Sequence, residues 1–212
     1  MLREKKGWAM DQGINLIYNL LFCDDLKLYK DNFKGELSPP WNTLFSELKD
    51  HNELVKIVKD PHYESRKKIL AYNELLRLGV KPERKELLGV IVEVSLDNGV
   101  DVLAAYRDNT ARYINYSGKM VIWENCVDQG INNKIAELIQ KGEQVIMRIG
   151  PWDKKRLPPP KKGDVRLTFL VSDGLYFGQG AFNLLSKDPI GGAVLKASAE
   201  LMKMLIDKSL KK

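Results

Sequence analysis

The hydrophobic period of the chain changes near Leu87, and this change is the strongest constraint on its fold. Before Leu87, apolar residues recur every three to four positions, as in amphipathic helices. After it, short segments rich in Val, Ile and Leu alternate with turn residues, as in strands. Asp97-Asn98-Gly99 lies between two such segments, and Asn-Gly is the strongest short hairpin signal. The sequence therefore predicts a helical N-terminal region followed by an antiparallel sheet.

The first 85 residues predict helices that share an apolar stripe of 3.6-residue period. These helices are Trp8–Phe22, Trp41–Leu48, a short segment around Leu54–Val58, and a segment that ends at Leu78. Asp60-Pro61 is expected to open the last of them, because Asp is favoured at an N-cap and Pro at the first helical position. Lys30–Pro40 contains Gly and Pro residues and predicts a loop.

Seven strands are predicted after residue 85, each a short segment between turn signals. They are 88–96, 100–107, 110–116, 119–124, 144–149, 165–171 and 175–180. A helix is expected over 128–141, closed by Gly142, and a last helix is capped by Asp188. The predicted fold class is α+β: a helical N-terminal region followed by an antiparallel sheet of about seven strands (β-β-β-β-α-β-β-β-α), with helices on one face. We predict a helical region over 1–85 and an antiparallel α+β domain over 86–212, with one integrated domain as the alternative.

Cysteine and histidine are scarce, which excludes two classes of small protein. Two Cys and two His are too few for a disulfide framework or a zinc module. No run approaches 18 apolar residues, so no membrane span is predicted. Ile14–Cys23 follows basic residues like the core of a secretion signal, but Asn15 and Asn19 interrupt it. We therefore expect a cytoplasmic protein in which Cys23 and Cys126 are reduced.

The net charge of +6 is spread evenly, since residues 1–85 and 86–212 each carry +3. The most unusual charged segment is the basic loop, residues 153–164, in which cations flank three consecutive prolines. Its cations are Lys154, Lys155, Arg156, Lys161 and Lys162. Proline favours an extended backbone, and the cations could contact phosphates of nucleic acid or anionic lipid. A solvated loop and a proline-rich partner ligand are the alternatives.

Several segments resemble a bacterial protein family of uncharacterised function. They are Ile17–Asp24, Leu88–Val94, Leu103–Tyr106, Arg112–Lys119 and Leu175–Gly180. The likeness runs from about Ile14 to the last helix. It implies a bacterial cytoplasmic origin and one integrated architecture, and it brings no activity, cofactor or catalytic residue.

Motifs for catalysis are absent or incomplete. No G-x-S-x-G elbow is present, and Ser65 and Lys68 match S-x-x-K without the partner motifs of that enzyme class. His62-Tyr63-Glu64 matches the H-x-E of zinc deaminases, but the P-C-x-x-C that supplies the thiolates is missing. Gly191-Gly192 favours close helix–sheet packing over a phosphate cradle. No metal site and no cofactor are predicted.

The strongest candidate for a site is a set of polar and aromatic residues on or beside the predicted strands. The candidate ligand-binding residues are Arg112, Tyr113, Asn115, Arg148, Trp152, Arg166 and Tyr176. If they converge, they form a polar–aromatic cleft suited to an anionic ligand or peptide. If they do not, they are cross-strand pairs on an exposed face.

The sequence identifies no substrate, and we expect the protein to act by binding rather than by catalysis. We predict a cytoplasmic, non-enzymatic binding module for a protein partner or a small anionic ligand. One alternative is a metal-independent enzyme with an Arg/Tyr/Asn cleft, for which Glu93 and Glu124 are the nominated carboxylates. The other is nucleic-acid binding through the basic loop 153–164. A homo-oligomer is compatible with an uncovered edge strand.

Overall fold

The computed structural model describes residues 12–124 and 127–210. Five helices precede the sheet: α1 (Gln12–Leu20), α2 (Leu26–Asn32), α3 (Trp41–Phe45), α4 (His51–Lys59) and α5 (Ser65–Arg77). Four of them coincide with predicted helical segments, whereas α2 was not predicted and overlaps the start of the expected loop at residues 30–32. The predicted helix start at Trp8 and the prediction for Cys126 lie outside the described residues.

The prediction that Asp60-Pro61 opens a helix is wrong. Asp60 instead follows the last turn of α4: its backbone N–H donates to the Lys56 carbonyl, and its side chain accepts from the backbone N–H of His62. α5 begins at Ser65, whose backbone N–H donates to the Asp108 carboxylate at 2.6 Å. The group that satisfies this helix terminus comes from a turn 43 residues away, so local sequence could not locate it.

The sheet has six antiparallel strands in the order β4-β3-β2-β1-β5-β6. The strands are β1 (Leu87–Leu96), β2 (Gly99–Tyr106), β3 (Ala111–Ile114), β4 (Met120–Trp123), β5 (Asp164–Val171) and β6 (Gly174–Ala181). The α+β class and the hairpin at Asp97-Asn98 are confirmed, because Leu96 pairs with Gly99. The central strand β1 pairs with β2 on one side and β5 on the other.

The predicted strand 144–149 is wrong, because α6 (Gln129–Ile146) continues through its first half and a turn follows. Gly142 does not close this helix but lies inside it, against the sheet. A Cβ atom at Gly142 would lie 2.7 Å from Leu87 Cδ2 and 3.0 Å from Val90 Cγ2. The glycine therefore allows the helix to approach β1 closely, a role that local sequence does not distinguish from a helix stop.

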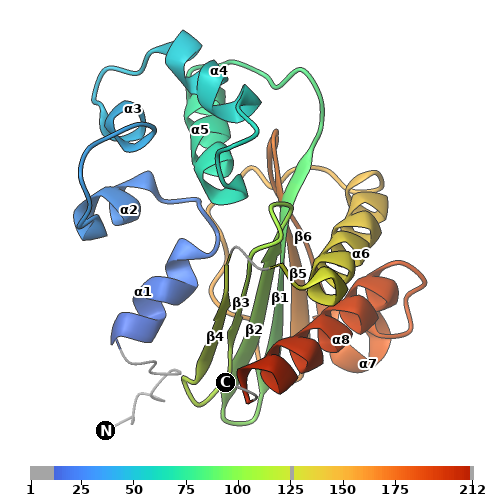
Figure 1. Cartoon of the computed structure of the whole chain (residues 1–212). Coiled ribbons are helices and arrows are strands. Elements are labelled where there is room, and N and C mark those ends of the chain that lie inside the picture. Colours follow the sequence, from blue (N-terminus) through green and yellow to red (C-terminus); the bar gives the residue numbers. More distant parts are fainter. Residues whose placement is uncertain (1–11, 125–126, 211–212) are drawn as a thin grey trace, which may run out of the picture.

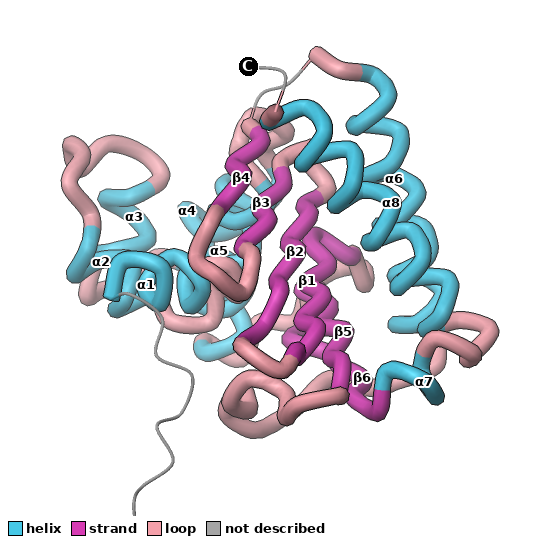
Figure 2. The backbone as a smooth tube through the Cα atoms, turned by 90° about the horizontal axis from the view of Figure 1, so that it is seen from below, coloured by secondary structure: helices cyan, strands magenta, loops and turns pink. Residues whose placement is uncertain are grey.

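Helices cover both faces of the sheet, so the expectation of one covered face is wrong. α6 and α8 (Gly191–Ser209) pack on one face, and the N-terminal helices lie on the other (Figures 1 and 2). A short helix, α7 (Phe182–Leu185), connects β6 to α8. Strand β1 explains why both faces of the sheet are covered. Its side chains are buried on both faces, as Val90 on one face and Ile91 on the other show. A strand that is apolar on both faces needs cover on both.

The N-terminal helices and the sheet share one hydrophobic core. On the sheet face that the N-terminal helices cover, one hydrophobic cluster contains Tyr18, Leu54 and Ile69 of the helices and Ile91 and Tyr106 of the strands. Within the part of the chain that the structure describes, no helix has both the length and the apolar character to cross a membrane.

Candidate functional site

The seven predicted ligand-binding residues do not gather on one surface. Arg112 and Arg166 lie on the sheet face covered by the N-terminal helices, whereas Tyr113 and Tyr176 belong to the core on the opposite face. Even the two arginines are separate, because β2 and β1 lie between their strands β3 and β5. Arg148 is exposed after the end of α6. The structure therefore divides the set into local clusters.

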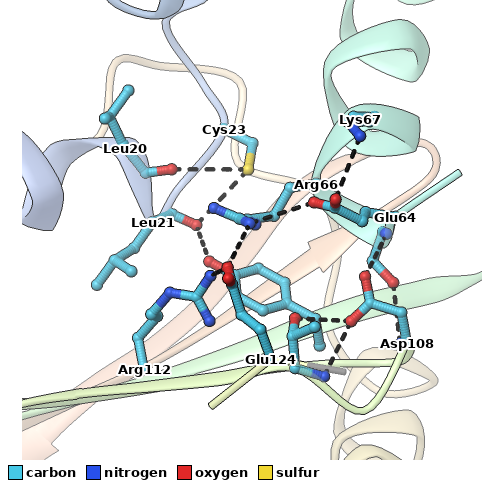
Figure 3. Close-up of polar contacts among 12 residues, drawn as sticks. Leu20, Leu21, Cys23, Glu64, Arg66, Lys67, Asp108, Arg112 and Glu124 are labelled. Carbon is cyan, nitrogen blue, oxygen red and sulfur yellow. Dashed lines mark hydrogen bonds and ion pairs between the residues drawn. The ribbon is translucent and has the colours of Figure 1, made fainter. Parts of the chain in front are cut away.

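Arg112 is buried in a network of charged groups at the start of α5 (Figure 3). Its guanidinium donates to the carbonyls of Ala111 and Trp123 and pairs with Glu124. Arg66 also contacts Glu124, at 3.4 Å. Burial, and then the nearby charge of Arg66, lowers the pKa of Arg112. Glu124, one of the two carboxylates nominated for the enzyme alternative, thus lies between the strand arginine Arg112 and Arg66.

Arg166 lies in a buried charge cluster with Glu93 and Tyr18. The Glu93 side chain is fully buried, and its Oε2 lies 3.6 Å from Arg166 Nη1. The Tyr18 hydroxyl of α1 donates to Glu93 Oε1 at 2.6 Å. Arg166 also donates to the carbonyls of Leu157 and Pro158 in the basic loop. The cluster therefore connects the sheet to α1 and to the basic loop.

Burial raises the pKa of Glu93, and the hydrogen bond from Tyr18 and the charge of Arg166 only partly oppose this effect. The carboxyl of the folded protein therefore keeps its proton to a higher pH than in the unfolded chain, where its ordinary value is 4.5. The stability associated with this bound proton is fully present at pH values below the ordinary pKa of 4.5. It is lost as pH rises through the raised folded value.

We therefore expect the Glu93→Gln variant to become more stable relative to the wild-type protein as pH rises above 4.5, because only the wild-type protein loses the stability associated with the bound proton. The amide keeps an acceptor for the Tyr18 hydroxyl and does not titrate. Urea unfolding at several pH values measures the difference, with exposed Glu47→Gln as the control. A difference between Glu93→Gln and wild type that is independent of pH contradicts the prediction.

The basic loop is held against the molecule by one of its cations. Arg156 donates to Asp24 at 2.8 Å and to Asn19 Oδ1 at 2.9 Å, and its guanidinium lies 3.8 Å from the centre of the Phe22 ring. Lys162 forms an exposed ion pair with Asp97. Two of the five cations that suggested a phosphate-binding segment thus have protein carboxylates as partners.

Trp152 and Tyr176 take part in contacts near the start of this loop. The Trp152 ring packs edge-on against Phe177 at 4.9 Å, and its indole N–H donates to the Lys155 carbonyl. The Tyr176 hydroxyl donates to Asp173, and Lys85 Nζ lies 4.6 Å from the centre of the tyrosine ring. These contacts hold β6 and its neighbouring turns together.

Tyr113 and Asn115 lie beside a cavity of about 370 Å³ between the sheet and α8, which we name the sheet–α8 cavity. Tyr113 lines it, and the Tyr113 hydroxyl donates to Asp101 Oδ2 at 2.9 Å and accepts from the Asn115 amide. The other lining residues are mostly apolar and come from β1, β2, α7, the residue that follows α7, and α8. They include Val92, Val94, Leu103, Phe182, Ser186, Gly192, Leu195, Lys196, Ala199 and Met202.

The sequence identified Tyr113 and Asn115 but not the residues of α8 that complete this cavity. Their only signal was the small size of Gly192, Ser198 and Ala199, which leaves space above the sheet. The expected role of Gly191-Gly192 in helix–sheet packing also needs correction for Gly192. A Cβ atom there would lie 2.6 Å from the Ser186 carbonyl oxygen, so this glycine allows a close turn between α7 and α8.

Among residues 12–124 and 127–210, no group of three or more His, Cys, Asp or Glu side chains is placed to hold a metal ion. The sheet–α8 cavity is therefore the site whose geometry we develop. No protein-family model matches the chain, and comparison with curated proteins and with solved structures finds no match.

Proposed function

We propose that the chain is a non-enzymatic protein that binds a small, largely apolar molecule carrying one polar group. The observation that carries this proposal is the sheet–α8 cavity, whose volume of about 370 Å³ falls in the range of small-molecule sites. Its deep wall is formed by buried Val92 and Leu103 of the sheet and Leu195 of α8. Such a wall removes apolar ligand surface from water.

Polar groups at the edge of the cavity would orient the ligand. The Tyr113–Asp101 pair lies on the strand side, and Lys196 lies on α8. A hydroxyl, amide or carboxylate on the ligand can exchange hydrogen bonds with these groups while the ligand's apolar part fills the interior. The half-exposed ring of Phe182 and the flexible Met202 side chain allow the walls to adapt to different shapes.

The enzyme and nucleic-acid alternatives have less support from the described contacts than small-molecule binding has. Glu93 lies beside Arg166 as an enzyme site would require, but it does not line the sheet–α8 cavity. Arg156, which a nucleic-acid site in the basic loop would use, is paired with Asp24. The cavity supports binding more directly than either cluster supports catalysis or phosphate contact.

A bulky substitution on α8 that fills the sheet–α8 cavity tests the proposal. N-phenyl-1-naphthylamine, an uncharged fluorophore, is expected to bind the wild-type protein with a fluorescence increase that saturates. Ala199→Trp places a large ring in the cavity and should weaken this binding at least about tenfold, equivalent to about 1.4 kcal/mol. Lys203→Trp, one turn further along α8 and outside the cavity, is the matched control.

The proposal is overturned if the wild-type protein does not bind the fluorophore. It is also overturned if Ala199→Trp binds as tightly as the Lys203→Trp control. Urea unfolding of both variants establishes that a loss of binding comes from the blocked cavity rather than from loss of the fold.

A further inference from the structure

A second cavity, of about 310 Å³, lies on the opposite side of the sheet among the N-terminal helices. We name it the α2–α5 cavity, because residues of α2 and the beginning of α5 form much of its lining. Its walls differ from those of the sheet–α8 cavity. One side is aromatic, and the other carries charged side chains.

The charges that line the α2–α5 cavity are unbalanced. Among the described lining residues, Lys34, Arg66 and Lys67 are cations and Glu64 is the only carboxylate. Glu64 is shared, with Arg66 and Lys67 each 3.2 Å from one of its oxygens (Figure 3). Lys34 is exposed and makes no hydrogen bond or ion pair with a described residue. One carboxylate thus serves two cations, and a third has none.

A third buried or partly buried cation, Arg112, lies beside this wall. Arg112 lies behind Arg66, and the two arginines share Glu124, as Figure 3 shows. Arg66 and Lys67 keep less than a quarter of their side-chain surface exposed, so water screens their repulsion less than it would on an open surface. An anion in the cavity would relieve this repulsion and accept charge-assisted hydrogen bonds.

The aromatic wall consists of the partly buried rings of Tyr29, Phe33 and Trp41. Trp41 lies 6.2 Å from Tyr29 in a stacked arrangement and 5.2 Å from Phe33. Lys67 Nζ lies 5.8 Å from the centre of the Trp41 ring, which brings the cationic and aromatic sides together. Aromatic walls favour a planar apolar group, and the neighbouring cations favour a negative one.

We propose that the α2–α5 cavity is a binding site for small aromatic anions, in which Lys34, Arg66 and Lys67 hold the negative group and the Trp41 wall contacts the ring. This site is separate from the sheet–α8 cavity and does not depend on the function proposed for it. It assigns a role to Arg66 and Lys67 that the sequence motifs did not indicate.

Naphthalene-2-sulfonate is the probe, and isothermal titration calorimetry is the measurement. The wild-type protein should bind one equivalent with a dissociation constant below about 1 mM. Lys67→Gln should weaken binding about tenfold, as expected for loss of one charge-assisted contact. Lys68→Gln makes the same charge change at the next residue, outside the cavity, and should leave binding unchanged. In the Ala199→Trp variant, whose sheet–α8 cavity is blocked, uncharged 2-naphthol should bind at least about tenfold more weakly than the sulfonate.

Lys34→Gln provides a second variant, because its exposed side chain can be changed without disturbing the core. It should also weaken binding, by a smaller factor than Lys67→Gln. Ala199→Trp should bind the sulfonate as the wild-type protein does, which distinguishes this site from the sheet–α8 cavity. The proposal is overturned if the sulfonate does not bind, if Lys67→Gln and Lys68→Gln bind it equally, or if 2-naphthol binds Ala199→Trp as tightly as the sulfonate does.

Discussion

The Arg166→Met variant is expected to unfold with a free energy about 3–5 kcal/mol below that of the wild-type protein at neutral pH. Removal of the guanidinium leaves the fully buried Glu93 without its only cationic partner within 4 Å in the described chain. It also leaves the carbonyls of Leu157 and Pro158 without their donor. Methionine keeps much of the length of the side chain, so the loss measures charge and hydrogen bonding more than volume. Urea unfolding gives the value.

Two further variants show whether this cost comes from the ion pair. Arg148→Met removes an exposed arginine and should change the free energy of unfolding by about 0.5 kcal/mol or less. Adding Glu93→Gln to Arg166→Met removes the unpaired carboxylate and should recover part of the loss, which a double-mutant cycle detects. A cost of Arg166→Met below about 1 kcal/mol would be inconsistent with a buried ion pair.

The Gly142→Leu variant is expected to lose about 3 kcal/mol of stability, or to fold with α6 displaced from the sheet. Even the first side-chain carbon would lie 2.7 Å from Leu87 Cδ2 and 3.3 Å from Phe169 Cδ1, both in the core. The better helix propensity of leucine offsets only about 1 kcal/mol of this cost.

The matched control is Gln144→Leu, an exposed position in the same helix, which should be close to neutral. Thermal and urea unfolding compare the two variants. If Gly142→Leu were as stable as Gln144→Leu, the close approach of α6 to β1 would not be needed for the fold.

The parts of the fold that depend on neighbouring residues were predictable from sequence. The hairpin at Asp97-Asn98-Gly99 is confirmed, because its turn is made within a few residues. The last helix begins at Gly191, later than predicted, although the Asp188 side chain does accept hydrogen bonds from the backbone N–H groups of Ile190 and Gly191. Gly142 shows where this reasoning ends. A glycine that stops a helix and a glycine that faces a strand look alike in sequence, and only the position of β1 separates them.

The candidate site was predictable only in fragments. Strand alternation already places Arg112 and Tyr113 on opposite faces, so these two could not line one cleft. Tyr113 was recognised, but its partner Asp101 and the α8 wall depend on how distant elements meet. Arg156 was grouped with solvated loop cations, and the contact with Asp24 that buries it spans 132 residues.

The position of β1 at the centre of the sheet has a consequence for the order in which the chain can fold during synthesis. β1 pairs at once with β2 through a short hairpin, but its other edge pairs with Val165–Val171, which emerges from the ribosome much later. Until then, an apolar strand has an open edge, which is the arrangement most prone to pair with another chain. The pairing of β1 with β5, which lies far along the chain, is therefore expected to limit the rate of folding.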